Sequence, residues 1–259
     1  MLLTVDVGNT NIAMGILNNS EIVGRYRLTT NRTRTSDEYG FYVRELLRQS
    51  GLMPEDIHDV IISSVVPKIM YSLSSCMIKY LGKKPIIVNS ELKTGITLDV
   101  ETPSSVGADR IVNTVYAYQT YKRSCIVVDF GTATTFDYVD NEGNFRYVII
   151  SPGLGISASA LTSQTAKLPE IEIQKPDSIL GTNTIKGMQA GVVYGYIGLV
   201  EYILRQMKKE LHDPDCHVIA TGGLGRVIAS ETEEIDEYDP DVAYKGMKIL
   251  YDMNKGDRL

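Results

Sequence analysis

Two turns that each begin with a carboxylate combine residue types suited to a metal-bound polyphosphate. The first is Asp6–Thr10 (DVGNT) and the second is Asp129–Thr134 (DFGTAT). In each turn a glycine lets backbone N–H groups approach an anion, and hydroxyl or amide side chains follow. The carboxylates can support Mg²⁺ directly or through water. Two such turns facing each other across a cleft would hold the phosphates of one nucleotide from both sides.

A single turn of this kind has a simpler explanation, because Asp, Gly and Asn populate turns for backbone reasons alone. Here Asp129 follows Asp6 by 123 residues in a chain of 259, and both turns lead into predicted β-hairpins. This spacing favours a duplicated fold with two phosphate loops. The duplication predicts an N-terminal half at residues 1–117 and a C-terminal half at 118–259, but it does not identify the substrate.

The elements around the two turns repeat as well. Short apolar runs predict three strands joined as consecutive hairpins in each half, at 2–7, 12–17, 22–28, 125–129, 134–139 and 145–150. Further strands are predicted at 60–63, 85–89 and 218–220, the last before a glycine turn at 221–225. Helical spacing of apolar residues predicts helices at 36–50, 67–80, 154–166 and 184–209 and near the C-terminus. Ser36 is the expected N-cap of its helix, and the stretch between 90 and 124 shows a less regular pattern.

Composition excludes several classes of function. The formal net charge of −6 has the wrong sign for a general nucleic-acid binder. The cysteines are three, widely spaced and without a C-x-x-C pattern, so neither a disulfide framework nor a zinc site is indicated. No histidine lies in a serine hydrolase or zinc peptidase motif. Without a signal-like N-terminus or an apolar run of membrane-spanning length, we expect a cytoplasmic enzyme with no membrane partner.

Further motifs extend these observations across most of the chain. In order, they are Ser63–Pro67, Pro103, Val106–Arg110, Pro152–Leu154, Leu168–Pro169, Gly181–Thr184 and Gly222–Gly223. With both carboxylate turns they make the chain resemble type III pantothenate kinases, and the Gly-Ala-Asp-Arg run at 107–110 is the discriminating part. The resemblance implies an α/β fold of duplicated actin-like ATPase (ribonuclease H-like) domains. Their mixed five-stranded sheets would be flanked by helices, with a cleft between the halves.

The same resemblance implies the activity. It would be ATP-dependent phosphorylation of pantothenate to 4′-phosphopantothenate, the first step of coenzyme A biosynthesis, by a homodimer that needs Mg²⁺ and a monovalent cation (K⁺ or NH₄⁺). Asp109 would be the general base for direct in-line transfer, and Asp129 would bind the monovalent cation. The ATP phosphates would be met by one loop and one residue of the second turn: Asp6, Val7, Gly8, Asn9, Thr10, Asn11, Ile12, Ala13 and Thr132.

The remaining roles concern the substrate and Mg²⁺. By resemblance, Gly107, Ala108, Asp109, Arg110 and Thr184 would contact pantothenate. Arg110 also suits this task chemically, because a guanidinium pairs with the carboxylate of a small acid. Asp6 is the candidate that organises Mg²⁺. Alternative explanations are an Asp109–Arg110 ion pair at a helix start, and Thr184 as a helix cap.

The chain departs from the family pattern at two places. Val100 occupies the position three residues before Pro103 at which the family usually has tyrosine. Tyr147-Val148 occupies the position shortly before Pro152–Leu154 at which a Gly-Gly pair is common. A kinase of another small alcohol and a non-catalytic nucleotide-binding regulator therefore remain alternatives. Gly153–Ala158 superficially fits a dinucleotide fingerprint, but it lacks the acidic residue expected at the end of a second parallel strand. A Walker A motif is absent.

Overall fold

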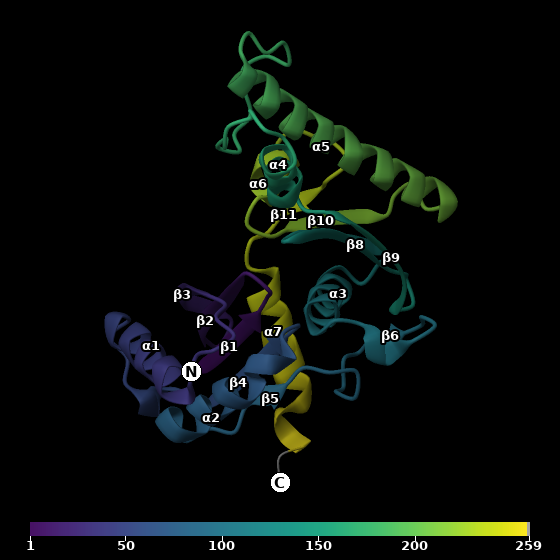
Figure 1. Cartoon of the computed structure of the whole chain (residues 1–259). Coiled ribbons are helices and arrows are strands. Elements are labelled where there is room, and N and C mark those ends of the chain that lie inside the picture. Colours follow the sequence, from purple (N-terminus) through teal and green to yellow (C-terminus); the bar gives the residue numbers. More distant parts are fainter. Residues whose placement is uncertain (258–259) are drawn as a thin grey trace. The chain divides into compact units, whose positions relative to one another are not determined.

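A computed structural model describes residues 1–257 of the chain (Figure 1). The chain forms two compact units, one of residues 1–120 together with residues from 241 onward, and one of residues 121–240. The predicted division after residue 117 assigned the C-terminal segment to the second half, whereas its contacts group it with the first. Residues 258–259 of the predicted C-terminal half lie outside the described residues. The assignment of two duplicated domains with these boundaries stays a prediction.

The first unit is built on a mixed sheet in the order β3-β2-β1-β4-β5. Its strands are β1 (Leu2–Val7), β2 (Asn11–Asn18), β3 (Glu21–Thr29), β4 (Asp59–Ser64) and β5 (Ile86–Ile87). The first three strands pair as antiparallel hairpins, and β4 and β5 continue the sheet in parallel. The short strand β6 (Thr97–Leu98) belongs to the same unit.

Helices cover both faces of this sheet because its strands alternate buried side chains between the faces. Leu3, Val5 and Val7 pack with α1 (Ser36–Gln49) and α2 (Met70–Leu81) on one face. Leu2 and Ile61 pack with α3 (Ala108–Tyr121) and α7 (Val242–Asn254) on the other. Short 3₁₀ turns complete the unit at η1 (Pro54–Asp56), η2 (Pro67–Ile69), η3 (Pro103–Ser105) and η4 (Lys255–Asp257).

The second unit repeats this design. Its strands are β7 (Cys125–Phe130), β8 (Ala133–Val139), β9 (Asn144–Pro152), β10 (His217–Thr221) and β11 (Glu237–Tyr238). Its helices are α4 (Leu154–Ser163), α5 (Thr184–Glu210) and α6 (Gly225–Ala229). Ile126, Val128 and Phe130 of β7 form a core with buried side chains of α5 such as Val193 and Tyr196.

The five strands β7–β11 of the second unit correspond in order to β1–β5 of the first. In the second unit the order is β9-β8-β7-β10-β11, where β7, β8 and β9 pair as antiparallel hairpins and β10 and β11 continue in parallel. This is the strand order and direction of the first unit. The predicted duplicated α/β fold with mixed sheets flanked by helices is therefore confirmed.

One prediction about a helix is wrong, and one helix was not predicted. The N-cap of α1 is Thr35 and not Ser36, because Thr35 Oγ1 accepts from the Glu38 backbone N–H (3.3 Å) while the Glu38 carboxylate accepts from the Thr35 N–H (2.8 Å). The stretch between 90 and 124 contains α3, whose apolar spacing is interrupted by the buried polar side chains of Asn113 and Thr114. Among residues 1–257, no helix has the length and apolarity needed to cross a bilayer.

Candidate active site

The first carboxylate turn links β1 to β2. Asp6 pairs with Ala13 across the hairpin, and the Gly8 N–H donates to the Asn11 carbonyl (2.9 Å) to close the turn. The side chains of Val7 and Ile12 are buried in the core, so only their backbones can face a ligand. Asn9, Thr10 and Asn11 are exposed at the tip. The predicted ATP-binding run 6–13 is thus a short, tightly bonded loop with an accessible tip.

The segment that follows β3 is bonded to this loop. Thr30 donates its backbone N–H to the Thr10 carbonyl (2.9 Å) and its hydroxyl to the Gly8 carbonyl (2.7 Å). Two residues further on, Arg32 Nη2 lies 3.5 Å from Asn9 Oδ1. The loop is therefore supported on one side by residues 30–32, which the sequence motifs do not single out.

Ser63 lies beside Asp6 in the parallel register between β1 and β4. Side chains of directly paired strand residues point to the same face of a sheet. Ser63 is fully buried, and its Oγ has no hydrogen-bond partner among the described residues. A buried hydroxyl without a partner is costly, so its position next to a carboxylate fits a site that receives a hydrated cation. The Ser63–Pro67 motif was the sequence signal for this position, although the motif alone assigned it no role.

Asp109 lies in the first turn of α3. Its Oδ1 accepts the Arg110 backbone N–H at 2.9 Å. Burial raises the pKa of the Asp109 carboxyl, and the bond from the Arg110 N–H and the nearby guanidinium offset part of that rise. The positive end of the helix dipole also favours a carboxylate here. Asp109 is therefore a partly desolvated carboxylate whose orientation is supported by a backbone hydrogen bond.

Contacts connect this helix start to the first loop. A Cβ added at Gly107 would lie 2.5 Å from Asp109 Oδ1 and 3.5 Å from Val65 Cγ1, so position 107 lies beside both side chains and has no room for one of its own. The Val65 N–H in turn donates to the Val7 carbonyl at 3.1 Å. The run 107–110 thus lies at the same edge of the first sheet as the loop 6–13.

The second carboxylate turn links β7 to β8, and two glycines pack closely around it. The Gly153 N–H donates to the Thr132 carbonyl (3.1 Å), and a Cβ at Gly153 would lie 2.3 Å from that same oxygen. Gly222 has a φ of +92°, and a Cβ there would lie 2.7 Å from Asp129 Oδ1. Both positions therefore require glycine. The structure brings Asp129, Thr132 and the two glycines together within the second unit.

Thr184 is the first residue of α5 and is exposed. The helix is capped by Asn183, whose Oδ1 accepts the Lys186 N–H at 2.9 Å. The alternative in which Thr184 serves as the cap is therefore wrong, and a substrate role for Thr184 stays a prediction. Tyr147 and Val148, the departures from the family pattern, lie partly exposed on β9.

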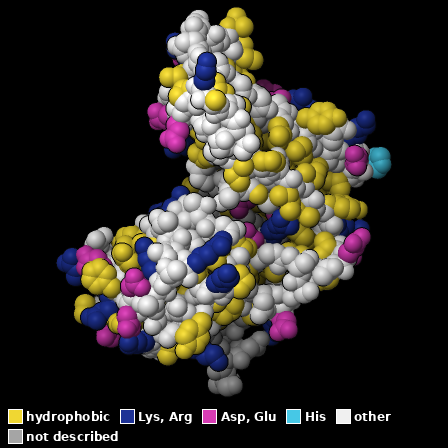
Figure 2. All heavy atoms as spheres, viewed as in Figure 1, with side chains coloured by type: hydrophobic (Ala, Val, Ile, Leu, Met, Phe, Trp, Pro, Cys, Tyr) yellow, Lys and Arg dark blue, Asp and Glu magenta, His cyan; other side chains and the backbone are white. Residues whose placement is uncertain are grey.

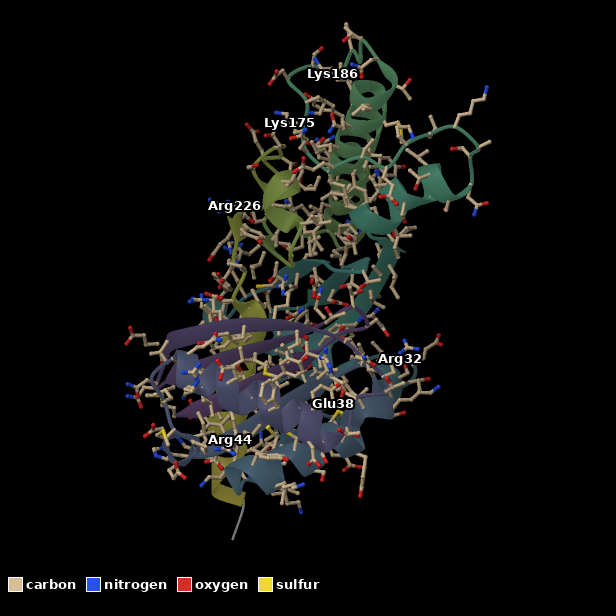
Figure 3. The ribbon with its side chains drawn as sticks, turned by 60° about the vertical axis from the view of Figure 1, so that its left-hand side comes forward. Arg32, Glu38, Arg44, Lys175, Lys186 and Arg226 are labelled. Atoms are coloured by element: carbon tan, nitrogen blue, oxygen red, sulfur yellow. The ribbon has the colours of Figure 1, made fainter. Side chains whose placement is uncertain are left out.

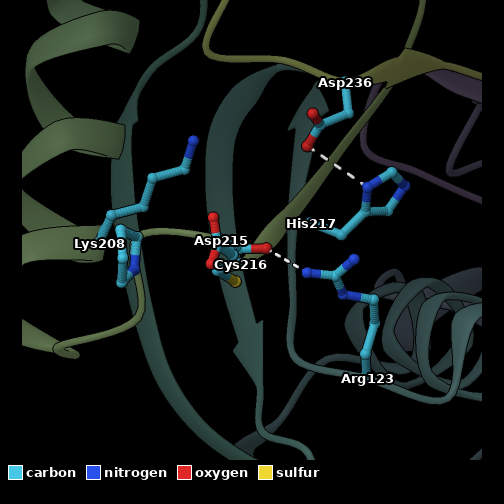
Figure 4. A pocket seen from close by; sticks show the side chains of 7 residues that line it. Arg123, Lys208, Asp215, Cys216, His217 and Asp236 are labelled. Atoms are coloured by element: carbon cyan, nitrogen blue, oxygen red, sulfur yellow. Dashed lines mark hydrogen bonds and ion pairs between the residues drawn. The ribbon is translucent and has the colours of Figure 1, made fainter.

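A cavity of about 420 Å³ lies elsewhere in the second unit (Figure 4). Its lining includes Arg123, Lys208 and Cys216, together with His217, whose Nδ1 lies 3.3 Å from Asp236 Oδ2. Arg123, Cys216 and His217 lie at the beginnings of β7 and β10, whereas Asp129 lies near the end of β7. Its lining includes none of the predicted site residues.

The described residues fit an Mg²⁺ ion that is shared with a nucleotide better than a metal ion that is bound by protein side chains alone. Among residues 1–257, no group of three or more His, Cys, Asp or Glu side chains could hold a metal ion. Mg²⁺ in kinases is typically bound through one or two carboxylates together with substrate phosphates, which matches Asp6 with its neighbouring hydroxyl. On the face drawn in Figure 2, Lys and Arg side chains are interspersed with Asp and Glu.

Comparisons with known proteins agree with this geometry. The sequence profile of the type III pantothenate kinase family matches residues 2–206. The type III pantothenate kinase of Agathobacter rectalis is 52% identical over 251 residues, which are 97% of this chain and 96% of that protein.

Two solved structures show the fold alone. Component A of (R)-2-hydroxyglutaryl-CoA dehydratase from Acidaminococcus fermentans superposes with a TM-score of 0.56 at 16% identity, covering 99% of each chain. The ethanolamine utilization protein EutJ from Carboxydothermus hydrogenoformans superposes with a TM-score of 0.57 at 16% identity, covering 96% of this chain and 89% of that one.

Proposed function

The chain belongs to the type III pantothenate kinase family, and on that basis we propose that it phosphorylates pantothenate to 4′-phosphopantothenate with ATP, the first step of coenzyme A biosynthesis. One observation carries the mechanistic part of this proposal. A partly desolvated carboxylate, Asp109, and a glycine-containing loop that begins with Asp6 lie at the same edge of the first sheet. This pairing is what direct transfer from a nucleotide to an alcohol requires.

In the proposed mechanism Asp109 accepts the proton of the primary hydroxyl of pantothenate as that oxygen attacks the γ-phosphate. The raised pKa of the Asp109 carboxyl makes it a stronger base than an ordinary aspartate. Arg110 pairs through its guanidinium with the carboxylate of pantothenate, and Gly107 and Ala108 line the same turn. Thr184 is proposed as a further substrate contact.

The phosphates are held by backbone N–H groups of the loop 6–13 and by Thr132 of the second turn. Mg²⁺, when bound, neutralises charge on the phosphate oxygens. Asp6 is proposed to hold the hydrated ion, and the buried Ser63 hydroxyl beside it supports that assignment. Asp129 is proposed to bind a potassium or ammonium ion. Its carboxylate oxygen is packed against Gly222, which keeps it at the strand end.

We also propose that the enzyme is a cytoplasmic homodimer, as the family resemblance implies. Apolar side chains are exposed near the start of α5, where Ile179 is 62%, Leu180 78% and Ile185 49% accessible. Exposed apolar surface of this kind is common at interfaces between protein chains. Size-exclusion chromatography with light scattering tests this point, and a monomer at micromolar concentration would contradict it.

A coupled assay of ADP release tests the function. Purified protein with Mg·ATP and a potassium salt should release ADP when pantothenate is added, and the product should have the mass of phosphopantothenate. A panel of other small alcohols, including sugars and short-chain hydroxy acids, serves as the comparison. Faster turnover of another alcohol would replace pantothenate as the substrate. Nucleotide binding without turnover of any alcohol would favour the regulatory alternative.

A further inference from the structure

The segment between β3 and α1 lies against the first phosphate loop in a defined conformation. Thr30 supplies the two hydrogen bonds to Gly8 and Thr10 described above. Asn31 Oδ1 accepts from the Thr33 backbone N–H at 2.9 Å and from its hydroxyl at 2.8 Å, which closes a tight turn. The hydroxyl of the buried Tyr39 donates to the Asn31 carbonyl at 3.0 Å. The backbone around residue 32 is therefore anchored on both sides.

Two arginines project from this segment, and they differ in what they contact. Arg34 Nη1 donates to the Thr29 carbonyl at 3.1 Å, and its guanidinium carbon lies 4.6 Å from the Tyr42 ring centroid. Arg34 therefore helps hold the segment against β3 and α1. Arg32 extends to the loop instead, and its contact with Asn9 Oδ1 is long at 3.5 Å and exposed (Figure 3). A contact of that length is weak, so the guanidinium retains most of its capacity to donate.

The loop 6–13 has no cationic side chain of its own to balance the charge of a bound triphosphate. Residues 6–13 include the carboxylate of Asp6 and no lysine or arginine. A triphosphate bound there is strongly anionic, and backbone N–H groups together with Mg²⁺ offset only part of its charge. A guanidinium presents several donors in a plane that matches phosphate oxygens, and such charge-assisted bonds are stronger than a neutral contact with an amide.

We propose that Arg32 is a phosphate-binding residue of this kinase. Its guanidinium exchanges the long contact with Asn9 for hydrogen bonds to the β- and γ-phosphates of the bound nucleotide. This inference rests on the proposed function only in requiring a nucleoside triphosphate at the loop 6–13, and it does not depend on the identity of the alcohol.

Nucleotide titrations without pantothenate test the proposal. Isothermal titration of the Arg32→Gln variant with Mg·ATP should give a Kd about tenfold or more above that of the wild type, because charged hydrogen bonds are lost. The Kd for AMP, which lacks the two outer phosphates, should stay unchanged. Arg32→Lys keeps the charge without the planar fork and should recover part of the ATP affinity.

Two matched arginine variants separate phosphate binding from folding. Arg44→Gln removes the same charge from the exposed side of α1 and should leave both Kd values unchanged (Figure 3). Arg34→Gln should instead lower the thermal midpoint, because that side chain bonds within the protein. Wild-type ATP affinity in Arg32→Gln would overturn the proposal, as would an equal loss of ATP and AMP affinity.

The same measurements distinguish failure of the Arg32 assignment from failure of the proposed function. If the wild type binds ATP and Arg32→Gln weakens it, but pantothenate is not phosphorylated, the assigned substrate fails while the assignment of Arg32 stands. If the wild type binds no nucleotide, both proposals fail together.

Discussion

Replacing Asp109 with asparagine tests the central mechanistic claim. Asparagine has nearly the same shape, and its Oδ1 can still accept the Arg110 backbone N–H that lies 2.9 Å from the carboxylate. What it cannot do is accept a proton from the attacking hydroxyl. General-base catalysis is worth a factor of about 10² to 10⁴, so kcat should fall by that amount, which is about 3–5 kcal/mol of barrier. The Kd for Mg·ATP should change little, because the loop 6–13 is untouched.

The pH dependence gives a second measurement on the same variant. Burial raises the pKa of Asp109 above its usual value of 3.8. A carboxyl with a higher pKa in the folded chain binds its proton more tightly there, so its contribution favours folding at low pH and is lost as the pH rises through the folded pKa. At neutral pH the ionised carboxylate therefore opposes folding, and Asp109→Asn should be at least as stable as the wild type. Below pH 3.8 any such difference between the two proteins should disappear.

The acid side of the rate profile follows from the same shift. Wild-type kcat should fall as Asp109 becomes protonated, at a pH above the ordinary aspartate range, and the residual rate of Asp109→Asn should lack this step. The rates come from the ADP-release assay, the stabilities from urea unfolding, and the Kd from calorimetry.

Asp37→Asn is the matched control, because Asp37 also lies in the first turn of a helix but bonds to Lys79 (2.6 Å) and Tyr80 (2.8 Å) on the surface. It should leave kcat unchanged. The reasoning about Asp109 would be refuted if Asp109→Asn lost ATP affinity and kcat to the same extent, or if it turned over at the wild-type rate.

Three further changes test the rest of the structure. Asp129→Asn should abolish activation by potassium in the ADP-release assay, and wild-type turnover that is indifferent to sodium in place of potassium would contradict the assigned cation. Gly153→Ala would place a Cβ 2.3 Å from the Thr132 carbonyl, so the second loop must shift. We expect kcat to fall by about 100-fold and urea unfolding to show a loss of about 1–3 kcal/mol, whereas an unchanged kcat would mean that the loop adapts freely. Thr35→Ala should cost about 1 kcal/mol of stability and Ser36→Ala less than about 0.5 kcal/mol, and the reverse order would show that the cap is misassigned.

Strands and hairpins could be predicted from the sequence because their signals are local. Leu3, Val5 and Val7 alternate with residues of the opposite face, and the turn residues that follow them end the strand. The same pattern recurs from residue 125, and strands β7–β11 follow the same order as β1–β5. Local alternation and turn chemistry act over a few residues, so they can be read from one sequence.

The features that were not predicted correctly depend on burial and on particular side-chain contacts, which a local pattern does not show. Helix α3 was not predicted because Asn113 and Thr114 are buried polar residues that interrupt its apolar spacing. Thr114 is nevertheless satisfied, since its hydroxyl donates to the Arg110 carbonyl one turn earlier. The N-cap is Thr35 because its hydroxyl, and not that of Ser36, accepts the Glu38 backbone N–H, and residue type does not separate the two since both Thr and Ser are common N-caps.

By itself, the sequence determined the duplicated order of strands, the residue types of both carboxylate turns and the family. The tertiary structure alone decided which of these residues meet. It places Ser63 beside Asp6 and the Gly107 turn beside Val65, and it returns the C-terminal helix to the first unit, where the Tyr251 hydroxyl bonds to Asp59 at 2.6 Å. These contacts join residues far apart in the chain, and the burial that stabilises them leaves no local periodicity to be read.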